Sequence, residues 1–289
     1  MNAFLNLGSD SPAAPASQSE AAKQRLLAVR GEPLAVVAWH RPLFLHYELD
    51  PGAVRQQLPR AFELELWQGR AIVSLVALTK RQFRPAESAP LWARLLPWLN
   101  EQRFFNVRTY VRHGDESGAF FFWSWLSRPW RLPLPDRPLG LTCAFADSSY
   151  QHRHESGELR GVVAAQLGRE RFEYEAQFSP EKAWATCPAG SLAEFALERY
   201  TGYFWHGGSG RVFRAWHPPW PQTIVEAVIK ETGLLARRFP WLVQARLIEA
   251  NYSPGFDDVW IGRPHTLGAA RPSRRPRNHH GASAFFEMP

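Results

Sequence analysis

Lysine, cysteine and long apolar runs are all scarce in this sequence, and each shortage argues against a class of protein. The two cysteines, Cys143 and Cys187, are too few for a disulfide framework. No uncharged apolar stretch approaches the roughly 18 residues that a membrane-spanning helix needs. The N-terminus lacks the basic start and apolar run of a signal peptide. We therefore expect a cytoplasmic protein with no membrane partner.

The scarcity of lysine also bears on nucleic-acid binding. The net charge is +7, but only four of the 34 basic residues are lysines. Residues 263–289 contain five arginines and one acid, so this short tail carries +4 of the excess. The rest of the chain is only mildly basic, which argues against a broad phosphate-binding surface. Nucleic acid is therefore not an expected partner, although an association through the arginine-rich tail stays open as an alternative.

Aromatic residues are abundant instead. The chain has 13 tryptophans and 19 phenylalanines among 289 residues, and its hydrophobic content of 45% is sufficient for a core. Large rigid rings fill wide interiors and also line ligand pockets, so their number alone favours neither use.

Composition and periodicity divide the chain into three parts. We expect a disordered leader over 1–33, a single domain over 34–262, and a disordered Arg/Pro/His-rich tail over 263–289. Apolar or alternating segments predict strands at 34–49, 62–67, 71–78, 103–113, 119–126, 139–146, 149–155, 158–167, 170–178, 211–216 and 242–252. Capping and periodicity predict short helices at 50–58, 91–99, 191–200 and 222–235. The fold class is therefore α+β, with a large antiparallel sheet closed into a barrel and a few short helices.

The predicted strand at 103–113 carries the first candidate binding residues. Asn106, Arg108 and Tyr110 alternate with apolar residues and therefore share one face. This face is either a solvent-exposed side of the sheet or a polar wall inside a barrel. In the second case Arg108 and Tyr110 would bind a carboxylate or a carbonyl, because the planar guanidinium meets carboxylate oxygens in pairs.

Two later segments carry the remaining candidates. Glu198, Arg199 and Tyr200 end a capped helix. The charges here either face solvent, or Glu198 forms a buried ion pair with Arg108 at the base of a pocket. His217 lies between Trp216 and Trp220 in a stretch fixed by three prolines. A rigid histidine of this kind is either a proton-transfer group or part of a structural corner.

Metal and cofactor motifs are missing from the sequence. His152 and His154 share one face of a predicted strand, but no third ligand follows at a recognisable spacing. The sequence also has no glycine-rich phosphate loop and no nucleotide-binding fingerprint. We expect neither a metal nor a cofactor.

Several of these segments together resemble the YqjF-like family (domain of unknown function 2071). The similarity runs from about Trp39 to Ile261, and its motifs are Asn106–Val111, Gly118–Phe122, Pro188–Ser191, Glu198–Tyr200, His217–Pro221 and Tyr252–Pro254. Departures from the family pattern, among them Phe104, Phe105 and Leu197, make the expected pocket more apolar. The resemblance implies a fold similar to that of acetoacetate decarboxylase, an antiparallel barrel-like domain with an internal cavity.

Acetoacetate decarboxylase works through a lysine that forms a Schiff base. The resemblance does not carry this chemistry over, because the four lysines are widely separated and none lies in the central strands between Lys80 and Lys182. Lys80 itself is expected at the end of a strand, beside a loop.

Two functional hypotheses follow. In the first, the protein binds a small, mainly apolar acid or carbonyl compound through Asn106, Arg108, Tyr110, Arg199, Tyr200 and Trp220. In the second, it is a lyase or isomerase in which His217 or Glu198 transfers a proton. The second requires His217 and Glu198 to converge on one cavity. The sequence gives no indication of the oligomeric state.

Overall fold

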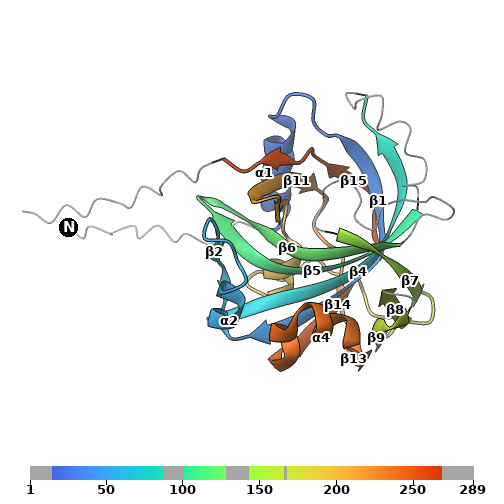
Figure 1. Ribbon diagram of the computed structural model, residues 1–289. Coiled ribbons are helices and arrows are strands. Elements are labelled where there is room, and N and C mark those ends of the chain that lie inside the picture. Colours follow the sequence, from blue (N-terminus) through green and yellow to red (C-terminus); the bar gives the residue numbers. More distant parts are fainter. Residues whose placement is uncertain (1–14, 88–100, 128–142, 166–167, 269–289) are drawn as a thin grey trace, which may run out of the picture.

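The computed structural model describes residues 15–87, 101–127, 143–165 and 168–268 (Figure 1). Strands dominate this part of the chain, and the helices are few and short. The helices are α1 (Pro15–Leu27), α2 (Pro51–Arg55), α3 (Leu192–Leu197), α4 (Gly233–Arg238) and the 3-10 helix η5 (Pro240–Gln244). The strands are β1 (Ala35–Leu49), β2 (Glu63–Leu64), β3 (Leu66–Trp67), β4 (Arg70–Pro85), β5 (Glu101–His113), β6 (Glu116–Ser127), β7 (Cys143–Arg153), β8 (Glu158–Ala165), β9 (Glu170–Gln177), β10 (Thr201–His206), β11 (Ser209–Trp216), β12 (Thr223–Ile224), β13 (Glu226–Glu231), β14 (Arg246–Tyr252), β15 (Gly255–Ile261) and β16 (His265–Thr266).

The strand pairings form a closed path. From β6 the path runs through β10, β11, β15, β1, β4 and β5, and β5 pairs with β6 again. A branch leaves β6 through β7, β8, β9 and β13. Most pairs are antiparallel, but β6 pairs in parallel with both β7 and β10. The sheet is therefore mixed, whereas the sequence predicts an antiparallel sheet.

Strand β4 is buried on both faces, which explains its long apolar sequence. Its residues from Ala71 to Thr79 are all buried. Leu75 and Ala77 belong to the largest apolar cluster of the described residues, whereas Val76 and Leu78 point to the opposite face. The central strands thus separate a packed core from a second interior space.

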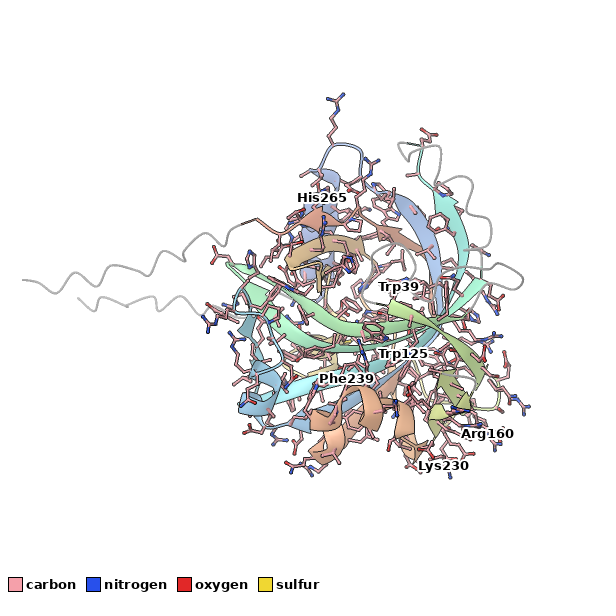
Figure 2. All side chains as sticks on the ribbon, in the orientation of Figure 1. Trp39, Trp125, Arg160, Lys230, Phe239 and His265 are labelled. Atoms are coloured by element: carbon pink, nitrogen blue, oxygen red, sulfur yellow. The ribbon has the colours of Figure 1, made fainter. Side chains whose placement is uncertain are left out.

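The packed core lies between the central strands and α4. Phe105 of β5 stacks on Phe172 of β9, with ring centroids 5.0 Å apart. Trp125 of β6 meets Phe239, just after α4, at 6.2 Å. In Figure 2, Trp125 and Phe239 lie on one side of the central strands and Trp39 lies on the other.

The predicted hairpin is confirmed by β5 and β6, which pair from Phe104 with Leu126 to His113 with Glu116. Gly114 turns the chain with φ of +60°, a conformation that suits glycine. The predicted strands at 158–167 and 170–178 correspond to β8 and β9, and the predicted strands at 139–146 and 149–155 are one strand, β7. The predicted helix at 91–99 lies outside the described residues.

The predicted disorder of residues 1–33 is wrong for its second half, because residues 15–27 form α1. This helix packs beside β11 (Figure 1). Ser19, Ala22 and Leu26 are buried, and their spacing of three and four residues puts them on one helical face. Residues 1–14 lie outside the described part of the chain. The predicted disorder of residues 263–289 is also wrong at its start, because β16 lies within this range and pairs with β11.

The predicted helix at 222–235 is also wrong. Residues 226–231 form β13, which pairs with β9 from Glu226 with Gln177 onwards. Gly233, expected to close a helix, begins α4 instead. Long-range pairing with β9 decides the conformation here, because the short apolar run Ala227, Val228 and Ile229 suits a strand as well as a helix. Strands β10 and β15 were not predicted.

Candidate functional site

A cavity of about 370 Å³ lies on the face of the central strands opposite the packed core. Its size is within the roughly 300–1,000 Å³ range of small-molecule sites. Alternate residues of neighbouring strands form its walls, as the pleat requires. On β4 these are Val76, Leu78 and Lys80, and on β5 they are Gln102, Phe104, Asn106 and Arg108.

Arg108 and Asn106 line this cavity, as the interior-wall interpretation of their alternation requires. The pairing of β5 with β6 shifts register between Val107 and Arg108, a bulge that re-aims side chains. Arg108 Nη2 donates a hydrogen bond to the Ala196 carbonyl oxygen at 2.9 Å. Its guanidinium lies 5.5 Å from the ring centroid of Phe44, which also lines the cavity.

Tyr110 does not line the cavity, although it was grouped with the ligand-binding residues. Its hydroxyl lies 2.6 Å from Ser74 Oγ, and Ser74 Oγ lies 2.7 Å from His46 Nδ1. All three side chains are fully buried. Burial lowers the pKa of His46 to about 3, so this chain of hydrogen bonds contains a neutral histidine at pH 7.

Glu198 forms hydrogen bonds with two residues that line the cavity, Tyr200 and Trp220. Its Oε2 accepts a hydrogen bond from the Tyr200 hydroxyl at 2.5 Å, and its Oε1 accepts one from the Trp220 backbone N–H at 2.9 Å. Glu198 does not form the ion pair with Arg108 that one hypothesis predicts. It lines a second, more open cleft. Burial raises the pKa of this carboxyl group, and the hydrogen bond from Tyr200 opposes that shift.

Arg199 also takes part in an ion pair. Its Nη1 lies 2.6 Å from Glu65 Oε2, and both side chains are largely buried. Arg199 lines both the cavity and the open cleft, so its guanidinium belongs to the wall between them. Because Arg199 already has a carboxylate partner, Arg199 is a weaker anion-binding candidate than Arg108.

His217, Tyr200 and Trp220 form an aromatic corner of the cavity. The His217 ring stacks on Tyr200 with centroids 4.6 Å apart and lies 4.9 Å from Trp220. His217 Nδ1 donates a hydrogen bond to the Pro218 carbonyl oxygen at 2.7 Å. Burial lowers the pKa of His217 to about 4, so the ring is neutral at pH 7. Both His217 and Glu198 therefore contact Tyr200, but His217 lines this cavity and Glu198 lines the open cleft.

Several residues that line the cavity carry a buried polar atom with no hydrogen-bond partner among the described residues. Leaving such groups unpaired costs about 1–3 kcal/mol each. Four are N–H donors and one is an acceptor: Trp39 Nε1, Gln102 Nε2, Arg108 Nε, Trp220 Nε1 and Asn106 Oδ1. The cavity is therefore apolar overall but rich in donors, the pattern that suits a ligand with acceptor oxygens.

Lys80 also lines the cavity, contrary to the position that the sequence predicts. It was expected at a strand end beside a loop, but β4 continues to Pro85 and Lys80 lies within it. Its Nζ lies 3.8 Å from the Phe104 ring centroid. Desolvation lowers the pKa of this amine to about 8, with the nearby Cys143 thiol opposing the shift. The alternation of Val76, Leu78 and Lys80 was a signal that could have found it.

The described residues contain no group of three or more His, Cys, Asp and Glu side chains that could hold a metal ion. His152, considered as a ligand, instead lies 2.7 Å through Nε2 from the Tyr174 hydroxyl. Within the same residues, none of the helices has the length and apolarity needed to span a membrane.

A family model for DUF2071, a family of uncharacterized conserved proteins, matches residues 37–256. The chain belongs to this family. The DUF2071 region contains the whole of the aromatic corner and Lys80. One curated relative is the uncharacterized protein YqjF of Bacillus subtilis (strain 168), 26% identical over 200 residues, which cover 66% of this chain and 76% of the relative.

Solved structures similar to this DUF2071 protein are acetoacetate decarboxylase-like. An acetoacetate decarboxylase-like enzyme from Sphingomonas wittichii RW1 has a TM-score of 0.53 at 14% identity, covering 82% of this chain and 94% of that one. The enduracididine biosynthesis enzyme MppR, complexed with pyruvate, has a TM-score of 0.56 at 14% identity, covering 82% and 92%. At these identities the likeness shows the fold alone. The resemblance to the family and to this fold is confirmed.

Proposed function

We propose that this DUF2071 protein binds a small, mainly apolar acid or carbonyl compound inside a barrel. The closed path of strand pairings through β6, β10, β11, β15, β1, β4 and β5 supports a barrel wall. The cavity on its inner face supplies the space for a ligand.

The observation that carries this proposal is the set of unpaired donors around an apolar space. Arg108 Nε, Trp220 Nε1 and Gln102 Nε2 are buried without partners among the described residues. A carboxylate or carbonyl oxygen would satisfy such donors, and the rings of Phe44 and Phe104 would cover an apolar body. Arg108 is the principal anchor, because its charge has no carboxylate partner in the described structure.

Native mass spectrometry after exposure of the protein to a metabolite extract tests this function. We expect the wild type to retain a small molecule that Arg108→Met loses. Arg160→Met is the matched control, because Arg160 lies at the surface of β8, paired with Glu175, and neither residue lines the cavity. The proposal fails if the wild type retains no added mass, or if Arg108→Met retains it as well as the control does.

A second candidate function is catalysis on the same ligand, and Lys80 is the observation that favours it. An amine with a pKa of about 8 is partly neutral near pH 7 and can attack a carbonyl carbon, forming an imine with loss of water. The similar solved structures are named as enzymes. Borohydride treatment with a bound carbonyl compound would then add mass at Lys80, and recovery of unmodified Lys80 would leave binding as the function.

The hypothesis of proton transfer by His217 or Glu198 receives less support. Glu198 lines the open cleft and not the cavity that His217 lines, so the two residues do not share one space. A histidine with a pKa of about 4 is also a weak base at pH 7. We therefore assign both residues to holding the cavity wall and not to catalysis.

A further inference from the structure

Two cations face the cavity without a carboxylate partner. Lys80 forms no ion pair or hydrogen bond in the described part of the chain and rests against the ring of Phe104. Arg108 donates only to the Ala196 carbonyl there. The other arginine that lines the cavity, Arg199, has a carboxylate partner in Glu65. Burying a cation without an anion costs free energy. Two such cations in one cavity therefore favour a ligand that carries negative charge.

These two cations are separated along the strands. Lys80 pairs with Gln102, whereas Arg108 pairs with Ser74, six residues earlier on β4. At about 3.3 Å per residue, the two backbone positions are roughly 20 Å apart. Both side chains point inward from these positions, because the Lys80 amine lies over Phe104 and the Arg108 guanidinium lies near Phe44. The cavity thus has a cation toward each end.

The surface between the cations is apolar. Val76 and Leu78 of β4 and Phe104 of β5 line this stretch of the cavity. Asn106 and Gln102 are the polar side chains of β5 that interrupt it, and each has an unpaired buried atom. A ligand that fits has an apolar middle and an acceptor group at either end.

We propose that the cavity selects a linear dicarboxylate, with one carboxylate bound by Arg108 and the other by Lys80. This inference rests on the proposed function and narrows its ligand class. Arg108 offers a planar donor group to the first carboxylate, and the Trp220 indole N–H adds a further donor in the same cavity. Lys80 offers a point charge to the second, with the Gln102 amide on the neighbouring strand.

Isothermal titration calorimetry at pH 7 with matched linear acids tests the proposal. The diacids are adipate, suberate and sebacate, and the matched monoacids are hexanoate, octanoate and decanoate. The proteins are the wild type, Lys80→Met, Arg108→Met and the control Lys230→Met. Lys230 lies at the outer surface of β13, paired with Glu175 at 3.0 Å (Figure 2). Near-ultraviolet circular dichroism establishes that each variant is folded.

We expect one diacid to bind the wild type about tenfold or more tightly than its matched monoacid, the effect of one charge-assisted contact. Lys80→Met should remove this preference but keep monoacid binding, Arg108→Met should weaken both, and Lys230→Met should change neither. Equal affinity for diacids and monoacids, or an unchanged preference in Lys80→Met, would overturn the dicarboxylate assignment and leave the proposed function standing. If no acid of either series binds the wild type, acid binding itself is refuted.

Discussion

Replacing Lys80 with methionine removes a cation from an apolar space while keeping the length of the side chain. Desolvation lowers the pKa of this amine from 10.5 to about 8. A difference of that size corresponds to about 3 kcal/mol, as an upper value, of unfavourable free energy for the charged amine in the folded protein. At pH 7 the amine is charged in both the folded and the unfolded protein, so this cost opposes folding in full. We therefore expect Lys80→Met to be more stable than the wild type at pH 7.

The pH dependence of the free energy of unfolding tests the sign of this effect. As the pH rises from 8 to 10.5, the folded protein releases the Lys80 proton while the unfolded chain keeps it. The unfolded state then binds more protons, so the stability contributed by this group rises with pH. The advantage of Lys80→Met over the wild type should consequently shrink from about 3 kcal/mol at pH 7 toward zero at pH 10.5.

Urea unfolding of the wild type, Lys80→Met and Lys230→Met at several pH values measures these differences. Titrating groups that do not interact with Lys80 cancel between wild type and variant, whereas loss of the Lys80 charge raises the pKa of the Cys143 thiol further. Lys230 forms a surface ion pair, so its replacement should change stability by less than about 1 kcal/mol, without the same pH trend. The reasoning is refuted if Lys80→Met is less stable than the wild type at pH 7, or if the difference between them is the same at pH 7 and pH 10.

Three further substitutions test other parts of the structure. Ser19→Ala removes a hydrogen bond to the His217 carbonyl and one from Trp216 Nε1, so thermal unfolding should show a loss of about 1–3 kcal/mol; an unchanged Tm would mean that α1 does not pack there. Gly255→Ala places a Cβ 1.8 Å from the Trp39 carbonyl oxygen at φ of +95°, so it should cost about 3 kcal/mol or more in urea unfolding, and a neutral effect would contradict the close approach of β15 to β1. Glu198→Gln removes a carboxyl group whose pKa is raised by burial, so wild-type stability relative to this variant should fall as the pH rises from 4 to 7 in urea titrations, and a constant difference would contradict the burial.

The cavity residues show which site predictions were within reach of the sequence. Arg108 and Asn106 were identified from alternation, since a strand places every second residue on one face. Tyr110 follows the same alternation but forms a hydrogen bond with Ser74 outside the cavity. Arg108 and Tyr110 lie on the same side of the register shift after Val107, so the shift does not separate them. The Tyr110 ring packs against Phe195 of α3, a contact that depends on the tertiary structure.

The sequence by itself determined the family, the preponderance of strands, the hairpin of β5 and β6, and the rigid aromatic segment around His217. These features depend on local composition, periodicity and turn residues. Only the tertiary structure decided that residues 226–231 form a strand, that residues 15–27 form a helix, and that Lys80 lines a cavity. In each of these cases the deciding interactions come from residues far away in the chain. Strand pairing, burial of a helix face and desolvation of an amine depend on residues that the fold brings together. Local sequence shows only which residues share a face, as the alternation of Val76, Leu78 and Lys80 does.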